Sequence, residues 1–192
     1  MNTLDLITYA TLIGATACAC VIGVRDSVRP AAQQAETVAS VVKQAAPVSV
    51  EAGVEVPDGD TSFKAYMDWH CITNTRSDQY KLQLECWTDD QGLRRHGDDY
   101  VIALGTFYAD RIGERYKITL DSGVTFTATV GDFKADKDTD SSNMYTPMQG
   151  SAKNVIEFVA DTPELPTMAR RMGDISYAGF EGNVERMVRL DG

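Results

Sequence analysis

The sequence lacks the motifs on which several common functions depend. Its 192 residues contain no glycine-rich phosphate loop, no CxxC pair and only two histidines, His70 and His96. Nucleotide binding and structural zinc therefore lack their usual signals. Positive charge is also scarce, since 18 Lys and Arg stand against 28 Asp and Glu, a net charge of −10. Nucleic acid and anionic lipid attract basic surfaces, so neither is expected as an electrostatic partner.

Charge is absent altogether from residues 6–24, near the N-terminus. A helix of this length extends for about 28 Å, close to the roughly 30 Å of a bilayer's hydrocarbon core. We therefore predict a single membrane anchor in residues 1–24. No Lys or Arg precedes the apolar run, which disfavours a cleaved signal peptide. A buried helix is the alternative.

Residues 25–61 have the composition of a stalk. Residues 31–46 predict a helix that begins after Pro30, with valines gathered on one face. Self-association through this face and a solvated linker helix are both open. Residues 47–61 contain two Pro and two Gly without a helical period, which indicates an extended linker.

From residue 62 to 192 the sequence has the pattern of short strands and turns. Leu82, Leu84 and Cys86 alternate with polar residues, the period of a half-buried strand. Residues 100–108 are almost continuously apolar, as in a strand buried on both faces. Further strands are predicted at 115–120, 125–130, 154–160 and 184–190, the first two joined by an Asp-Ser-Gly hairpin turn.

One short helix is predicted over residues 162–173. Thr162 can serve as its N-cap, Pro163 as its first residue and Gly173 as the residue after its end. The fold class is therefore mainly β, with six or seven short strands and one short helix. This pattern favours a small barrel over a helix-rich α/β sheet.

The order of these elements resembles the double-psi β-barrel domains of barwin, expansin, rare lipoprotein A and membrane-bound lytic transglycosylase A. The block ALGTFYADRIGERYKITL, residues 103–120, is similar to that family's first motif, with Gly113 at the turn before the strand. Asp132 matches the family's strand-ending aspartate, and Glu157 lies where its second acid occurs. This chain departs from the family in having Asp-Phe-Lys where Asp-Thr-Gly or Asp-Arg-Gly is common.

The resemblance implies a carboxylate site that cleaves or binds glycan. Glu157 lies among Val155, Ile156, Phe158 and Val159, which would desolvate it as the proton-donating acid. Asp132 would be the ionised partner that stabilises positive charge at the anomeric carbon. The side chains expected to contact the sugar are Lys134, Asn143 and Tyr145. No cofactor and no metal are expected.

Blander interpretations of these residues stay open. Glu157 can be the solvent-facing member of an alternating strand, and Asp132 can cap a turn after Gly131. Asp136, Asp138 and Asp140 have calcium-loop spacing, but Ser141 and Pro147 stand where that loop needs Gly and Glu, which favours a solvated acidic loop. Cys71 and Cys86 are equally compatible with a disulfide and with two buried thiols.

The sequence thus predicts a membrane-tethered domain that acts on peptidoglycan, as a lytic transglycosylase-like enzyme. The rival hypotheses are a noncatalytic glycan- or protein-binding module and an assembly component of a cell envelope or of a phage-derived machine. A cell-wall role requires an extracytoplasmic domain. Arg25 and Arg29 follow the anchor, however, which favours the cytoplasmic side by the positive-inside rule. The orientation stays open.

Overall fold

A twisted sheet of short strands organises the chain, and a computed structural model describes it for residues 53–190. The strands are β1 (Gly53–Val54), β2 (Tyr66–Asp68), β3 (Trp87–Thr88), β4 (Arg94–His96), β5 (Asp99–Leu104), β6 (Arg115–Leu120), β7 (Thr125–Phe133), β8 (Thr146–Pro147), β9 (Lys153–Asn154), β10 (Glu157–Ala160) and β11 (Val184–Leu190). The α-helices are α1 (Asp78–Glu85) and α2 (Thr167–Met172), and the 3-10 helices are η1 (Trp69–Cys71), η2 (Asp136–Asp138), η3 (Gln149–Ser151), η4 (Thr162–Glu164) and η5 (Ile175–Ala178).

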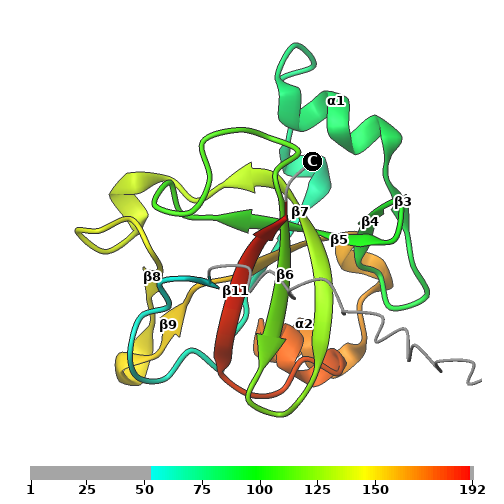
Figure 1. The fold of residues 1–192 in the computed structure, drawn as a ribbon. Coiled ribbons are helices and arrows are strands. Elements are labelled where there is room, and N and C mark those ends of the chain that lie inside the picture. The colour runs from blue at the N-terminus through cyan, green and yellow to red at the C-terminus, as the bar shows by residue number, and fades with distance from the viewer. Residues whose placement is uncertain (1–52, 191–192) are drawn as a thin grey trace, which may run out of the picture. The chain divides into compact units, whose positions relative to one another are not determined.

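The main sheet has the strand order β1-β11-β6-β7-β5-β10-β2, with β4 and β3 attached beside β5. Two pairs are parallel, β5 with β7 and β2 with β10, and the other neighbours are antiparallel. The strands β8 and β9 form a separate two-stranded sheet (Figure 1). The end strands β1 and β2 do not pair with each other, so hydrogen bonds do not close the described sheet into a barrel. The protein is mainly β, but the expected barrel closure is absent from this part of the chain.

The strongest sequence predictions of strands are confirmed. Val101, Ile102, Ala103 and Leu104 of β5 are all buried, as the apolar run predicted. The predicted hairpin joins β6 to β7, and Gly123 occupies its turn with a φ of 90° that favours glycine. The core on one face of the sheet contains four aromatic rings, with centroids 4.6–5.9 Å apart: Tyr100, Phe126, Phe158 and Phe180.

The predicted strand at residues 81–87 is wrong, because most of it belongs to helix α1. Ser77 is the N-cap, and its hydroxyl accepts a hydrogen bond from the Tyr80 N–H. The buried side chain of the helix is Gln83, whereas Leu84 is 67% exposed. The alternation of leucines was therefore not the alternation of a sheet face. The fold has two α-helices in place of the one expected, and they lie at opposite ends of the view in Figure 1.

Two other predicted elements are interrupted. Residues 162–173 form η4 and then α2 instead of one helix, although Gly173 ends α2 in the left-handed conformation, with a φ of 68°. Residues 154–160 divide between β9 and β10, and the intervening Val155 and Ile156 are fully buried. In both places the chain keeps its apolar contacts but changes direction.

The folded unit extends N-terminal to residue 62, where we placed its boundary. Strand β1, within the segment expected to be stalk, pairs with β11 through Gly53 and Val54. The predicted anchor at 1–24 and the predicted stalk helix lie outside the described residues. Among residues 53–190, no helix is long and apolar enough to cross a bilayer.

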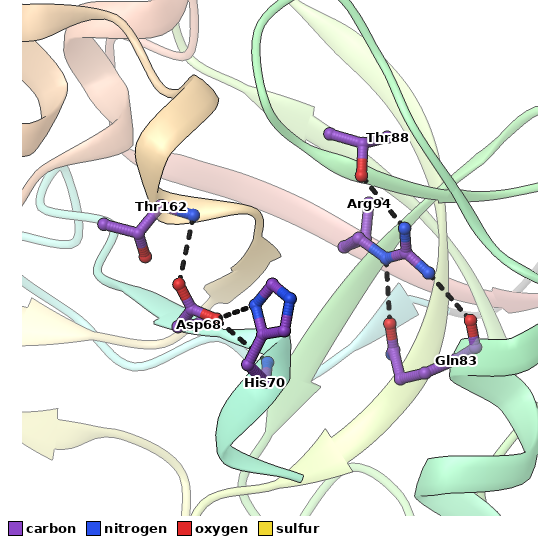
Figure 2. A network of polar contacts seen from close by, with 6 residues as sticks. All are labelled: Asp68, His70, Gln83, Thr88, Arg94 and Thr162. Atoms are coloured by element: carbon purple, nitrogen blue, oxygen red, sulfur yellow. Dashed lines mark hydrogen bonds and ion pairs between the residues drawn. The ribbon is translucent and has the colours of Figure 1, made fainter.

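A buried arginine joins helix α1 to the sheet. Arg94 of β4 donates hydrogen bonds to the Gln83 side chain (3.1 Å), the Gln83 carbonyl (2.7 Å), the Cys86 carbonyl (3.0 Å) and the Thr88 hydroxyl (2.9 Å), as Figure 2 shows in part. The guanidinium carbon also lies 4.7 Å from the centre of the Trp69 ring. Burial lowers the pKa of Arg94, so these hydrogen bonds hold a desolvated charge.

We expect Arg94→Met to lower the free energy of unfolding by about 3 kcal/mol, because it leaves buried carbonyl and amide groups without donors. Arg171→Met, at an exposed position of α2, is the control and should change stability by less than about 0.5 kcal/mol. Urea denaturation followed by tryptophan fluorescence measures both. Equal midpoints for the two variants would contradict a stabilising role for the network.

Candidate functional site

The two predicted carboxylates lie on the same face of the sheet, on either side of β5. Ala103 of β5 pairs with Asp132 of β7 in one direction and with Glu157 of β10 in the other. Residues in register across neighbouring strands project from the same face, and two strand spacings separate their Cα atoms by about 9.5 Å. The side chain between the two acids is a single methyl group. The sheet therefore places Asp132 and Glu157 on the same face, with β5 between them.

Glu157 lies in a groove of about 360 Å³ whose lining includes Lys134, Asp138 and Asn154. The Lys134 Nζ atom donates a hydrogen bond to Glu157 Oε2 at 3.2 Å. The Lys134 side chain is 1% exposed, whereas that of Glu157 is 25% exposed. The Lys134 ammonium group is therefore the ion-pair partner of Glu157 inside this groove.

Asp132 lies in a second groove, of about 310 Å³, which Ser77 and Gln79 line from the side of α1. Burial raises the pKa of Asp132, and the charge of Glu157 raises it further. Hydrogen bonds from the Phe133 N–H, at 2.9 Å, and from the Gln79 side chain oppose that rise without cancelling it. The surroundings of Asp132 therefore favour its protonated form more than water does.

The surroundings of the two acids thus differ from those expected from the sequence. We predicted that apolar neighbours would desolvate Glu157 and that Asp132 would be ionised. Those neighbours do not isolate Glu157, because its side chain points to the face where Lys134 lies. The cover over Asp132 comes from residues 71–79, which are distant in sequence. Met67 of β2 lines both grooves, so the two acids belong to adjoining hollows of one surface.

Asn143 and Tyr145 do not line either groove. Asn143 accepts a hydrogen bond from the Thr139 hydroxyl at 2.9 Å, and its φ of 57° fits a tight turn. Tyr145 packs against the hydrophobic core, with Lys153 Nζ 5.1 Å from its ring centre. Lys134 is the one predicted sugar-contacting residue that lies beside Glu157, and its burial keeps it from open contact with a ligand.

The aspartates of residues 136–140 organise their own loop. Asp140 accepts hydrogen bonds from three backbone N–H groups, those of Ser142 (2.9 Å), Met144 (2.7 Å) and Tyr145 (3.0 Å). Burial alone would raise its pKa, but these hydrogen bonds lower it. Within residues 53–190 no group of three or more His, Cys, Asp or Glu side chains is arranged to hold a metal ion. The loop is a hydrogen-bonded turn.

The two cysteines of the described chain are free thiols. Cys71 is exposed and lines the groove of Asp132. Cys86 is partly buried, and this burial raises the pKa of its thiol to about 11. The structure therefore agrees with the thiol alternative and not with a disulfide, and only one of the two is removed from solvent.

The residues that the sequence did not reveal come mainly from η1 and α1. Gln79 reaches Asp132 because residues 78–85 are helical, and Met67 separates the two grooves because β2 pairs with β10. A signal was present for the helix, since Ser77 and Asp78 are a favourable N-cap and first residue. No local pattern could have indicated the position of Met67.

Two other polar clusters have structural explanations. Asp68 accepts hydrogen bonds from His70 at its backbone N–H (2.9 Å) and its ring (2.7 Å), and from the Thr162 N–H (3.2 Å), so it ties β2 to η4 (Figure 2). Burial works against this charge, yet the hydrogen bonds lower the pKa of Asp68 to about 2.

A groove of about 460 Å³ gathers three arginines of the described chain, Arg111, Arg115 and Arg189. Each of them has a carboxylate partner. Arg115 pairs with Asp99 at 2.5 Å, Arg189 pairs with Glu114 at 2.7 Å, and Arg111 lies 3.5 Å from the same glutamate. These pairs neutralise most of the positive charge, so the groove is not a strong anion site.

Asp132→Asn tests the burial of this carboxyl group. A folded-state pKa above the unfolded value of about 3.9 means that Asp132 contributes stability below that pH and loses the contribution as the pH rises through the folded-state pKa. We therefore expect Asp132→Asn to be more stable than the wild type at pH 7, because the amide removes the buried charge. The difference should vanish toward pH 3 in urea denaturation.

Asp140→Asn is the matched control with the opposite sign. Its carboxylate has a lowered pKa, so it contributes stability at neutral pH that disappears as the pH falls through the folded-state pKa. Asp140→Asn should therefore be less stable than the wild type at pH 7. The same sign for both variants would show that the two carboxyl groups do not differ as described.

Comparisons with known proteins add no assignment to this geometry. No protein-family model, no curated protein and no solved structure matches the chain. A function for the chain therefore rests on its own side chains, chiefly Asp132, Glu157 and Lys134.

Proposed function

We propose that the chain is a membrane-tethered enzyme that cleaves peptidoglycan glycan strands, in the manner of a lytic transglycosylase. The observation that carries this proposal is the pair of unlike carboxyl groups on one sheet face. Burial raises the pKa of Asp132, while Glu157 is paired with an ammonium group. Two titratable groups whose environments differ in this way are typical of acid-catalysed cleavage.

In this mechanism Asp132 donates its proton to the glycosidic oxygen of the leaving sugar. The bond from that oxygen to the anomeric carbon breaks, and positive charge develops on the remaining sugar. The Glu157 carboxylate stabilises that charge. A hydroxyl group of the same sugar then attacks the anomeric carbon and gives its proton to the Asp132 carboxylate, which restores the acid. One proton donor is sufficient because no water has to be activated.

The proposed fold for this activity is a double-psi-like barrel, of which the described open sheet would be the main part. Two features support it: the motif resemblance over residues 103–120 and the two parallel strand pairs, β5 with β7 and β2 with β10. Peptidoglycan lies outside the cytoplasmic membrane, so the proposal places the domain there. The apolar run at residues 6–24 would be its anchor.

A noncatalytic glycan-binding module is the second candidate. It is favoured by exposed aromatic side chains, since Trp87 is 53% and Phe107 45% exposed. Aromatic faces of this kind stack on sugars without any chemistry. Neither side chain lines the grooves of Asp132 and Glu157, so binding through them would not depend on either acid.

Incubation of the full chain with purified peptidoglycan, followed by mass spectrometry of the soluble products, tests the enzyme proposal. We expect anhydro-sugar products from the wild type. Asp132→Asn should reduce the rate by a factor of about 100 or more, because it removes the general acid. Glu157→Gln should reduce it by a factor of about 10–100, since it removes the charge that stabilises the transition state.

Matched controls come from exposed positions away from both grooves. Asp90→Asn and Glu185→Gln make the same chemical changes in the β3–β4 turn and on β11, and they should retain wild-type rates. Absence of products from wild-type protein that pellets with peptidoglycan would favour the binding module. Full activity in Asp132→Asn would exclude the proposed acid.

A further inference from the structure

We infer that Lys134 is a positioning residue, which holds Glu157 in a partly buried ion pair and thereby fixes the negative charge that acts on Asp132. This inference rests on the proposed function for its catalytic meaning. Its physical content is independent of the reaction, because it concerns the electrostatic coupling of two carboxyl groups through one ion pair. It also changes the role expected for Lys134, from contact with the sugar to action through Glu157.

The backbone fixes the position of Lys134 with respect to both acids. Its N–H donates to the Leu104 carbonyl at 2.9 Å, which continues the pairing of β7 with β5 by one residue. Lys134 follows Asp132 by two residues, so the two side chains leave the chain on the same face. The Lys134 Nζ atom extends from there to Glu157 of β10, and it lies 3.2 Å from Glu157 Oε2.

The burial of Lys134 makes its ion pair with Glu157 energetically important. The Lys134 side chain is 1% exposed, so its charge has almost no access to solvent. Burial lowers the pKa of Lys134, and the carboxylate of Glu157 opposes that effect. A buried ammonium group left without a partner carries a large desolvation penalty. The charges of Lys134 and Glu157 therefore stabilise each other within the ion pair.

The charge on Glu157 then acts on Asp132. Like charges on a shared surface disfavour each other, and the pKa of Asp132 rises in part through Glu157, after burial itself. Other ionisable groups near the two acids are Asp138 in the groove of Glu157 and Cys71 in that of Asp132. The intervening strands β5 and β2 contribute only the uncharged Ala103 and Met67 to these linings. Among the described residues, Lys134 is accordingly the one cationic side chain that lines either groove, and it pairs with Glu157 and not with Asp132.

The test is a titration of the side-chain carboxyl carbons of the full chain by NMR, for the wild type, Lys134→Met and Lys134→Arg. In the wild type, Glu157 should lose its proton at lower pH than Asp132. In Lys134→Met the Glu157 transition should move to higher pH and overlap that of Asp132. Lys134→Arg keeps the positive charge and should preserve the order. Unchanged curves in Lys134→Met would overturn the inference.

Glu157→Gln provides a second test that does not depend on the folding of Lys134→Met. It removes the negative charge but keeps a hydrogen-bond acceptor for Lys134. Asp132 should then titrate at lower pH than in the wild type. An unchanged Asp132 titration would show that the two acids are not coupled, and would overturn the inference as well.

The pH profile of peptidoglycan cleavage separates this inference from the proposed function. If Lys134 keeps Glu157 charged, the acidic limb of the profile should move to higher pH in Lys134→Met and return in Lys134→Arg. A profile of Lys134→Met that coincides with the wild-type profile would contradict the positioning role. If the wild type cleaves nothing, the proposed function fails, and the NMR titration alone decides the inference.

Discussion

The pairing of β5 on both of its edges is the constraint on which the rest of the structure depends. On one edge β5 is parallel to β7 and on the other antiparallel to β10, so segments far apart in sequence meet at Ala103. All four residues 101–104 are buried, which leaves no freedom to slip the register without exposing apolar side chains. The positions of Asp132 and Glu157 follow directly from that register.

The buried ammonium group of Lys134 is the second constraint. The pairing of β5 stabilises the fold, whereas the burial of this charge has a desolvation cost. Hydrophobic side chains of similar volume often stabilise a fold as well as a buried ion pair does, or better. The chain nevertheless places Lys134 at 1% exposure beside Glu157. A contribution to stability alone does not explain such a pair. Control over the charge near a neighbouring carboxyl group would explain it. Local departures from the most stable arrangement are expected where function requires them.

The sequence was sufficient to predict a strand where its local pattern and its tertiary contacts favour the same structure. Strands β5, β6, β7 and β11 combine apolar runs or alternation with clear turn residues, and all four exist, although β5 ends at Leu104 and β7 extends to Phe133. Such reasoning fails in segments where two patterns compete. Residues 81–87 show the alternation of a strand but follow the N-cap Ser77, and contacts with Arg94 hold them as a helix. The open edge of the sheet likewise depends on pairings that no local pattern reveals.

The error in helix α1 explains why the sequence did not predict the burial of Asp132. Read from its neighbours, Glu157 was the desolvated acid, and Asp132, followed by Phe133 and Lys134, had no local reason to be buried. Desolvation is a tertiary property, however, and the groove around Asp132 is lined from Ser77 and Gln79 at the start of α1. A segment interpreted as a strand could not supply that cover. The sequence therefore indicated both acids as candidates, whereas the burial of Asp132 depends on a helix that the sequence pattern did not predict.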